Sequence, residues 1–313
     1  MSDSSRRPRG FADRLTAPLP SARDVARMAR EPRPSAAEQA RAGAVLALPP
    51  RTSLPPVGPD TTAVTWVGHA TFVVRTGGHT ILTDPVWSRR IPPFIARYTP
   101  PGVDWAALPR IDAVVISHNH YDHLDAPTIR RLPRSTPMLV PAGLAHWFRR
   151  RGFRDVTDLD WWQSRRIGAL TCTFVPTHHW SRRGLTDTNR SLWGGWVLAT
   201  DGGPTIYFAG DTGYGPRFAE VAARRRGLDV ALLPIGAYEP RWFMRNQHMN
   251  PEDAVRAAAD LGVRRVVPMH WGTFALSTEP LLEPPERLRT AWQAAGRDPS
   301  DLWRLGIGET RTM

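Results

Sequence analysis

Hydrophobic and polar positions divide the chain into a strand meander followed by two series of strands and helices. β-branched and aromatic residues dominate 64–67, 71–75 and 80–83. Glycines between these runs predict tight turns, so we expect an antiparallel meander. The next run, 113–117, is almost entirely apolar, which predicts a strand buried on both faces. This run ends abruptly at a cluster of histidines.

Strands and helices then alternate to the end of the chain. Asn250 is expected to cap a helix that begins at Pro251, because Asn suits the cap and Pro the first helical position. This order favours an α/β fold, a sandwich of two mixed sheets with helices outside and ligands gathered from loops at one edge. The pattern predicts helices at 124–132, 144–150, 217–226, 251–261 and 285–295, and strands at 138–140, 170–175, 193–199, 205–209, 230–234 and 265–269.

The first 60 residues have few aromatic side chains and weak periodicity, and they include the Pro-, Ala- and Arg-rich stretch 31–37. We therefore expect residues 1–60 to form a partly disordered arm with one or two short helices. Residues 61–313 are long enough to bury a sizeable core and are expected to form one domain.

The formal net charge is +12, and all 41 basic residues are Arg because the sequence contains no Lys. This charge is compatible with nucleic acid or an anionic membrane as a partner. The Arg residues are scattered, however, and a GC-rich coding bias would give the same composition. We therefore do not expect nucleic acid to be a partner, and the sequence does not indicate an oligomeric state.

The single cysteine, Cys172, excludes an internal disulfide, so the fold does not require an oxidising compartment. The N-terminus has basic residues without the apolar stretch of a secretion signal. No run approaches about 18 apolar residues, the length of a membrane span. We therefore expect a cytoplasmic protein, with peripheral contact at a membrane as an open alternative.

The run His118-Asn119-His120-Tyr121-Asp122-His123 places four candidate metal ligands in six residues, directly after the buried strand. Imidazole and carboxylate are ligands that zinc favours. Alternate residues of a loop can face one ion while the next pair faces a second. A polar surface loop is a poor explanation for three His and one Asp at this spacing.

Further candidate ligands follow later strands. His178 and His179 follow 170–176, Asp211 follows 206–208 and His270 follows 266–269. Each alone is compatible with an ordinary turn or a structural histidine. The repeated order of an apolar strand and then His or Asp favours one metal centre instead.

These residues resemble the metallo-β-lactamase superfamily, and within it the N-acylphosphatidylethanolamine-hydrolysing phospholipase D family. The resemblance covers about residues 60–313. The six-residue motif is typical of the whole superfamily, whereas the stretches at 238–244 and 270–274 are more specific. The stretches that carry the resemblance are Trp66–Thr71, Leu82–Pro85, Leu192–Trp196, Phe208–Tyr214, Pro234–Met244, Gln247–Glu252 and His270–Phe274.

The resemblance implies an αββα sandwich and two Zn²⁺ ions per chain, although iron or manganese can occupy such sites. One ion would be held by His118, His120 and His179, and the other by Asp122, His123 and His270. Asp211 would bridge both. His179 is preferred over His178 because it directly precedes Trp180, as in the family, and His178 remains the alternative.

The implied reaction is hydrolysis of a phospholipid phosphodiester to phosphatidate and an N-acylethanolamine. Two metal ions would generate hydroxide near neutral pH. Asp122 or Asp211 would orient it or relay its proton, and His248 would lie near the substrate phosphate. The open alternative is a metal-dependent lactonase or another phosphodiesterase, because fold and ligands do not specify the substrate.

For several other residues the sequence is compatible with two roles, one at the site and one in the structure of the fold. His69 and Asp84 either orient metal ligands or are structural. Tyr238, Trp242, Phe243 and Met244 form an apolar loop that suits acyl chains or packs in the core. The segment Ile91–Tyr98 is either a membrane-facing loop, with Arg97 meeting a phosphate, or a buried connection.

Overall fold

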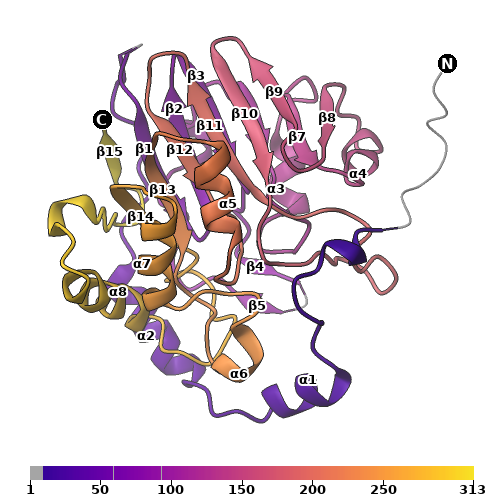
Figure 1. The fold of residues 1–313 in the computed structure, drawn as a ribbon, viewed down its shortest axis with the longest axis vertical. Coiled ribbons are helices and arrows are strands. Elements are labelled where there is room, and N and C mark those ends of the chain that lie inside the picture. Colours follow the sequence, from indigo (N-terminus) through magenta and orange to yellow (C-terminus); the bar gives the residue numbers. More distant parts are fainter. Residues whose placement is uncertain (1–9, 59, 93) are drawn as a thin grey trace.

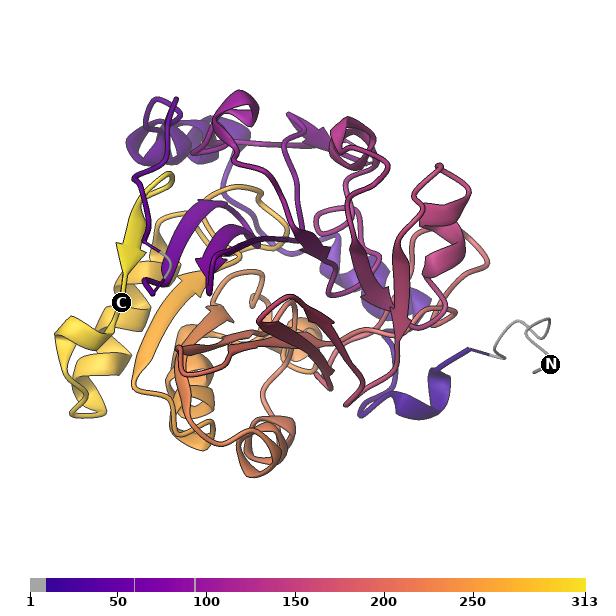
Figure 2. The ribbon, with the colours of Figure 1, turned by 90° about the horizontal axis from the view of Figure 1, so that it is seen from above.

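Two β-sheets lie face to face, with helices on their outer sides, in the computed structural model (Figures 1 and 2). The model describes residues 10–58, 60–92 and 94–313. This αββα arrangement confirms the fold expected from the sequence.

The first sheet has seven strands in the order β15-β1-β2-β3-β6-β7-β8. Strands β1, β2 and β3 pair antiparallel, which confirms the predicted meander. Strands β3, β6, β7 and β8 run parallel, so the sheet is mixed. Its strands are β1 (Ala63–Gly68), β2 (Thr71–Thr76), β3 (His79–Thr83), β6 (Ala113–Val115), β7 (Met138–Pro141), β8 (Val156–Leu159) and β15 (Thr310–Thr312).

The second sheet has six strands in the order β14-β13-β12-β11-β10-β9. Strands β9 to β12 pair antiparallel, and β12, β13 and β14 pair parallel. A separate two-stranded hairpin is formed by β4 (Arg90–Ile91) and β5 (Ile95–Ala96). The strands of the second sheet are β9 (Ser164–Ile167), β10 (Leu170–Val175), β11 (Gly195–Thr200), β12 (Thr205–Phe208), β13 (Leu228–Pro234) and β14 (Arg265–Met269).

The five predicted helices are present. Asn250 caps α7 as expected, because its side chain accepts a hydrogen bond from the backbone N–H of Asp253. Helices α5 and α7 lie on the outer side of the second sheet (Figures 1 and 2). The α-helices are α1 (Ala22–Met28), α2 (Ala36–Leu46), α3 (Ala126–Arg131), α4 (Ala145–Arg149), α5 (Arg217–Arg224), α6 (Arg241–Met244), α7 (Pro251–Asp260) and α8 (Glu283–Ala294). Three 3₁₀ turns lie at Ala12–Arg14, Trp105–Ala107 and Pro299–Asp301.

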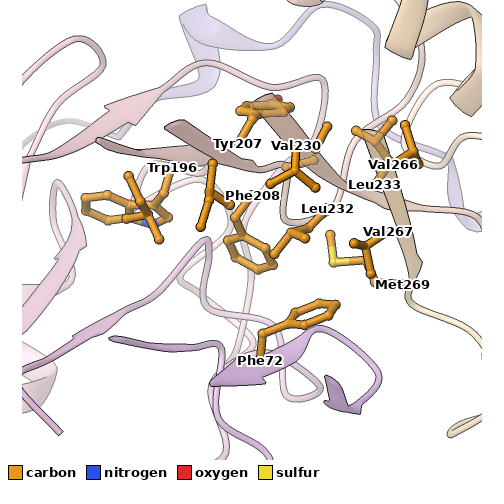
Figure 3. Packing of buried hydrophobic residues seen from close by; sticks show 14 of the residues in the cluster. Phe72, Trp196, Tyr207, Phe208, Val230, Leu232, Leu233, Val266, Val267 and Met269 are labelled. Atoms are coloured by element: carbon orange, nitrogen blue, oxygen red, sulfur yellow. The ribbon is translucent and has the colours of Figure 1, made fainter. Parts of the chain in front are cut away.

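Alternation along the strands of the first sheet creates two apolar layers. Val74, Ile81 and Val115 belong to the core between the sheets, while their chain neighbours, such as Leu82 and Val114, pack on the outer face. Figure 3 shows the inner layer, where Phe72 of the first sheet points toward apolar side chains of the second. Both faces are therefore covered, as the continuous apolar run at β6 predicts.

The parallel strands bring the candidate chemistry to one edge of the sandwich. Strands β3 and β6 are parallel neighbours, so Asp84 and His118, which follow them, emerge on the same side. Strands β12 and β14 both run parallel to β13, and Asp211 and His270 follow these two strands. Strand direction alone therefore places ligands from both sheets at a common edge.

Part of the segment expected to be a disordered arm is described by the structure. Residues 10–58 include α1 and α2 and follow the edge of the sandwich that carries the candidate ligands (Figure 1). Residues 1–9 lie outside the described residues, and the division at residue 60 stays a prediction. Among the described residues, no helix is long and apolar enough to cross a membrane.

Candidate metal centre

Three histidine nitrogens converge at the end of β6. Nε2 of His118 lies 2.9 Å from Nδ1 of His120, and Nε2 of His179 lies 3.3 Å from the same atom. Ligands placed 2.0–2.1 Å from a tetrahedral ion are about 3.3 Å apart. The spacing of these three nitrogens therefore suits one cation.

A second cluster lies beside the first and contains both acidic and imidazole groups. Oδ2 of Asp122 is 3.4 Å from Nε2 of His123 and 3.3 Å from Nε2 of His270. Asp211 contacts the same two rings, at 3.2 Å to His123 and 3.0 Å to His270. These distances have the spacing of ligands around a single ion.

Asp211 also lies between the two clusters. Its Oδ2 atom is 3.9 Å from Nε2 of His118 and 3.8 Å from Nε2 of His179. The structure therefore brings together all seven predicted ligands, and one carboxylate faces both groups. Their roles as ligands remain predictions.

Hydrogen bonds on the outer side of the rings fix which nitrogen faces the centre. Nδ1 of His123 donates to Asp84 at 2.7 Å, and Nδ1 of His179 donates to the carbonyl oxygen of Gln247 at 3.1 Å. Nδ1 of His118 lies 2.9 Å from Oγ of Ser117, whose hydroxyl donates to Asp84. Such partners leave the Nε2 lone pairs free to point inward.

Burial and charge set the protonation of the cluster. Burial lowers the pKa of His120 to about 4, and the imidazole must be neutral to bind a metal. Burial alone would raise the pKa of Asp211, but the His123 and His270 imidazoles hold it well below its usual range. Burial would likewise lower the pKa of His270, yet the Asp211 and Asp122 carboxylates raise it to about 9. The ionised carboxylates are what a cation site requires, and a cation that binds His270 must displace the proton that these carboxylates favour there.

Several buried polar atoms of the centre have no hydrogen-bond partner among the described residues. Buried polar groups are normally paired, so such a group of atoms needs an explanation. A divalent cation supplies one, since imidazole nitrogen and carboxylate oxygen are its ligands. The residues therefore fit a metal. The unpaired atoms that face the clusters are His123 Nε2, Asp211 Oδ1 and His270 Nε2.

Two further histidines lie against the clusters. Nε2 of His69 hydrogen-bonds Oδ2 of Asp122 at 2.9 Å, and its backbone N–H donates to Thr273. Burial and the neighbouring His270 lower the pKa of His69 to about 3, so its ring is neutral. Nδ1 of His248 is 3.9 Å from Oδ2 of Asp211. Both rings are close enough to the ligands to orient them or to meet a substrate.

His178 faces away from the clusters. Its Nδ1 atom lies 2.8 Å from Oγ1 of Thr16 in the arm, while the ring of His179 lies 4.6 Å from that of His118. Of the two alternatives, the structure therefore brings His179 into the centre.

The predicted apolar loop divides into two parts. The side chain of Tyr238 is fully buried and donates to Glu283 on α8, which is not the exposed position that contact with an acyl chain requires. Met244 is also buried and packs against Met28 of α1. Trp242 and Phe243 are half-buried and line a cavity of about 190 Å³.

Of the two readings of the segment Ile91–Tyr98, the buried connection fits Arg97, because its side chain does not reach out to a phosphate. Its guanidinium donates to the carbonyl oxygens of Val86 at 2.6 Å and Ser88 at 3.1 Å. Phe94 at the neighbouring hairpin tip is 83% exposed, which leaves the tip itself available for a contact.

The sequence analysis missed three residues that support the centre. Ser117 links His118 to Asp84, and its place between β6 and the histidines was a usable signal. Gln247 acts through its backbone carbonyl, which no side-chain pattern reveals. Arg183 donates to the carbonyl oxygen of Asn119, within the ligand loop, at 3.2 Å and to that of Leu124, directly after it, at 2.6 Å.

Comparison with known proteins agrees with this geometry. A family model described as a beta-lactamase superfamily domain matches residues 79–271. An uncharacterized protein of Mycobacterium tuberculosis is 45% identical over 73% of this chain, which spans 63% of that protein's length. N-acyl-phosphatidylethanolamine-hydrolyzing phospholipase D 1 of Caenorhabditis elegans is 38% identical, over 74% of this chain and 69% of that protein. The solved metallo hydrolase Igni18 of Ignicoccus hospitalis superimposes with a TM-score of 0.62 at 25% identity, covering 81% of this chain and 98% of that one.

Proposed function

Because this chain belongs to the metallo-β-lactamase superfamily and is a metal-dependent hydrolase, we propose that it hydrolyses N-acylphosphatidylethanolamine or a related phospholipid with two zinc ions. The observation that carries the proposal is the pair of buried ligand clusters that share Asp211. The similarity to the phospholipase D of Caenorhabditis elegans supports the choice of substrate.

In this proposal, His118, His120 and His179 would hold one ion, Asp122, His123 and His270 would hold the other, and Asp211 would serve both. The chemistry that a bound metal pair supplies is a hydroxide nucleophile near neutral pH and neutralisation of charge on phosphoryl oxygens. The ligands keep their inward orientation through Asp84, Ser117 and the carbonyl of Gln247.

The chain's own groups orient the reaction. The oxygen of water bonds to phosphorus, the bond from phosphorus to the ethanolamine oxygen breaks, and a proton from the water passes to that oxygen, which gives phosphatidate and an N-acylethanolamine. The carboxylate of Asp122 or Asp211 accepts a hydrogen bond from the attacking water and directs its lone pair toward phosphorus. Nδ1 of His248 is buried without a partner among the described residues, so it is available to hydrogen-bond a phosphoryl oxygen.

The proposal includes peripheral contact with a lipid surface. Phe94 and Leu185 are 83% and 90% exposed. The loops that carry them both contact Tyr121 of the ligand loop, through apolar packing and through a hydrogen bond to Arg183. Exposed Arg residues lie next to both tips, and apolar tips flanked by Arg suit an anionic membrane surface.

Product analysis by mass spectrometry tests the function. Zinc-loaded protein is incubated with N-acylphosphatidylethanolamine in detergent micelles, beside an Asp211→Asn control. Phosphatidate and N-acylethanolamine, absent with the control, are the expected products. Folded, metal-loaded protein that releases neither product from this lipid would remove the substrate proposal, and lactones and simple phosphodiesters would then be assayed.

A further inference from the structure

Among the described residues, the ring of His120 has no outer hydrogen bond, unlike the other two rings of the three-histidine cluster. Its Nδ1 atom faces the cluster, at 2.9 Å from Nε2 of His118 and 3.3 Å from Nε2 of His179. Its Nε2 atom, on the far side of the ring, is buried without a hydrogen-bond partner in the described part of the chain. The rings of His118 and His179 are held by Ser117 and by the carbonyl oxygen of Gln247. A different contact is therefore needed to orient the ring of His120.

Trp180 provides such a contact. Its ring centre lies 4.7 Å from that of His120, with the two planes at 73°, which is the edge-to-face arrangement that aromatic rings favour. The remaining ring contacts of His120 that the described residues provide are with His118 and His179, which are candidate ligands themselves. Trp180 can thus limit rotation of the His120 ring from outside the ligand set.

The side chain of Gln247 fixes the indole of Trp180. Nε1 of Trp180 donates to Oε1 of Gln247 at 2.9 Å. Gln247 is itself buried, and its backbone N–H donates to the carbonyl oxygen of Met244 at the end of α6. Its own carbonyl oxygen accepts a hydrogen bond from Nδ1 of His179 at 3.1 Å. Gln247 therefore holds His179 through its backbone and His120 through its side chain and Trp180, so a side-chain substitution separates the two effects.

The arm closes the outer side of this pair. Arm residues 15–19 line, together with Trp180 and Gln247, a cavity of only about 10 Å³. Such a space holds one water molecule at most. The arm is held here by Thr16, whose Oγ1 atom lies 2.8 Å from Nδ1 of His178. Trp180 therefore has little room to move toward the arm and away from His120.

We propose that Trp180 and the side chain of Gln247 are positioning residues that set the orientation of His120, and through it the affinity of the three-histidine cluster for its ion. This inference rests on the two metal ions of the proposed function. Neither side chain belongs to the ligand set. Their ring and hydrogen-bond contacts with candidate ligands, among the described residues, are with the three-histidine cluster and not with the second cluster. We therefore expect an effect on one ion only.

The test is a titration of the full-length protein with zinc in competition with a chromophoric chelator. Trp180→Leu should weaken one of the two binding steps about 10–100-fold, as the loss of a group that supports a ligand does, and leave the other step as in the parent. Trp105→Leu is the matched control, because this half-buried indole packs on Trp87 and Arg131, neither of which is a candidate ligand. It should leave both steps unchanged.

Removal of the ligand His118 identifies which ion is affected. His118→Ala leaves the second cluster as the remaining site, so the addition of Trp180→Leu should not change the affinity for the remaining ion. A further fall in affinity in this background would mean that Trp180 acts on the fold as a whole. That result would overturn the inference.

Two milder variants test the hydrogen bond itself and cover the case in which Trp180→Leu does not fold. Trp180→Phe removes the donor and Gln247→Leu removes the acceptor, while the backbone carbonyl that holds His179 stays. Each should weaken the same binding step about 10-fold, and the double variant should lose no more than either alone. Losses that add, or zinc affinities equal to the parent's in the variants that fold, would contradict the proposal. Zinc binding is measured without lipid, so absence of lipid hydrolysis would refute the proposed reaction and leave this result standing.

Discussion

At the scale of single residues, the centre depends on which nitrogen of each histidine points inward. Outer hydrogen bonds to Asp84, Ser117 and Gln247 hold the Nδ1 atoms of His123, His118 and His179. Each such bond keeps the proton on Nδ1, so the inward Nε2 is unprotonated and is a better ligand. The arrangement therefore favours metal binding before any ion arrives.

The neighbours His178 and His179 provide a matched pair of substitutions. His179→Ala should lose metal and more than about 100-fold in activity, because changing residues that only support a ligand already costs 10–100-fold. His178→Ala should keep the parent's metal content and lose about 1 kcal/mol of stability with the contact to Thr16. Metal analysis and thermal unfolding of both variants check this, and metal loss in His178→Ala would contradict our assignment.

At this scale the sequence predicted the side chains that strand ends fix, and it left two readings open for those whose position depends on packing. All seven candidate ligands follow buried strands, so their convergence was predictable. Two readings stayed open for Tyr238 and Arg97 because an aromatic ring or a guanidinium suits a substrate and a protein interior equally well. Only the surrounding carbonyl and carboxylate groups, which come from distant segments, distinguish the two.

At the scale of elements, the ligand loop after β6 is held from outside by the loop at 181–190. The guanidinium of Arg183 donates to the carbonyl oxygens of Asn119 and Leu124 and lies 4.2 Å from the ring centre of Tyr121. The hydroxyl of Tyr121 donates back to the carbonyl oxygen of Arg183 at 2.7 Å. These contacts add to the two backbone hydrogen bonds within the loop, in which the N–H groups of His123 and Leu124 donate to the carbonyl oxygen of His120.

Arg183→Gln should weaken zinc affinity about 10–100-fold, because the loop that presents His118, His120 and His123 is released. Competition with a chromophoric chelator measures this affinity. Arg182→Gln is the control, since Arg182 is exposed and bonds only Gly184 within its own loop. Equal zinc affinity in both variants would show that Arg183 does not hold the ligand loop.

Elements with a strong apolar pattern were predicted almost to the residue, and short edge strands were not. Strand β10 has the predicted bounds, Leu170–Val175. Strand β9, Ser164–Ile167, has three exposed residues and two arginines, and its pairing with β10 makes it a strand. Strand β15 was not predicted either, because it forms by pairing with β1, which lies about 250 residues earlier in the chain. A local pattern contains no information about such a partner.

At the scale of the whole molecule, some of the arginine side chains that give the large positive charge pack against aromatic rings of the fold. Arginines lie over aromatic rings, at 3.6 Å for Arg151 on Trp147 and 4.2 Å for Arg131 on Trp105. These side chains contribute to packing as well as to charge. The count of basic residues is therefore a poor guide to a partner, as their scattered distribution indicated.

Removal of metal should destabilise the whole protein. An ion that binds only the folded state contributes about 2.7 kcal/mol at 100 times its Kd, which corresponds to a shift in Tm of about 5 °C. Calorimetry before and after dialysis against a chelator should show at least this decrease, and added Zn²⁺ should reverse it. Identical Tm values would mean that the buried cluster does not bind metal in the folded protein.

The central claim is that the two buried clusters around Asp211 form one two-metal centre. The most direct test is the metal content of the folded protein, measured by mass spectrometry of the elements after loading with Zn²⁺ and removal of free ions. We predict two zinc ions per chain for the parent protein and fewer for Asp211→Asn, because the shared carboxylate is then lost. A parent protein that is folded, fully loaded and holds only one ion, or none, would contradict the claim.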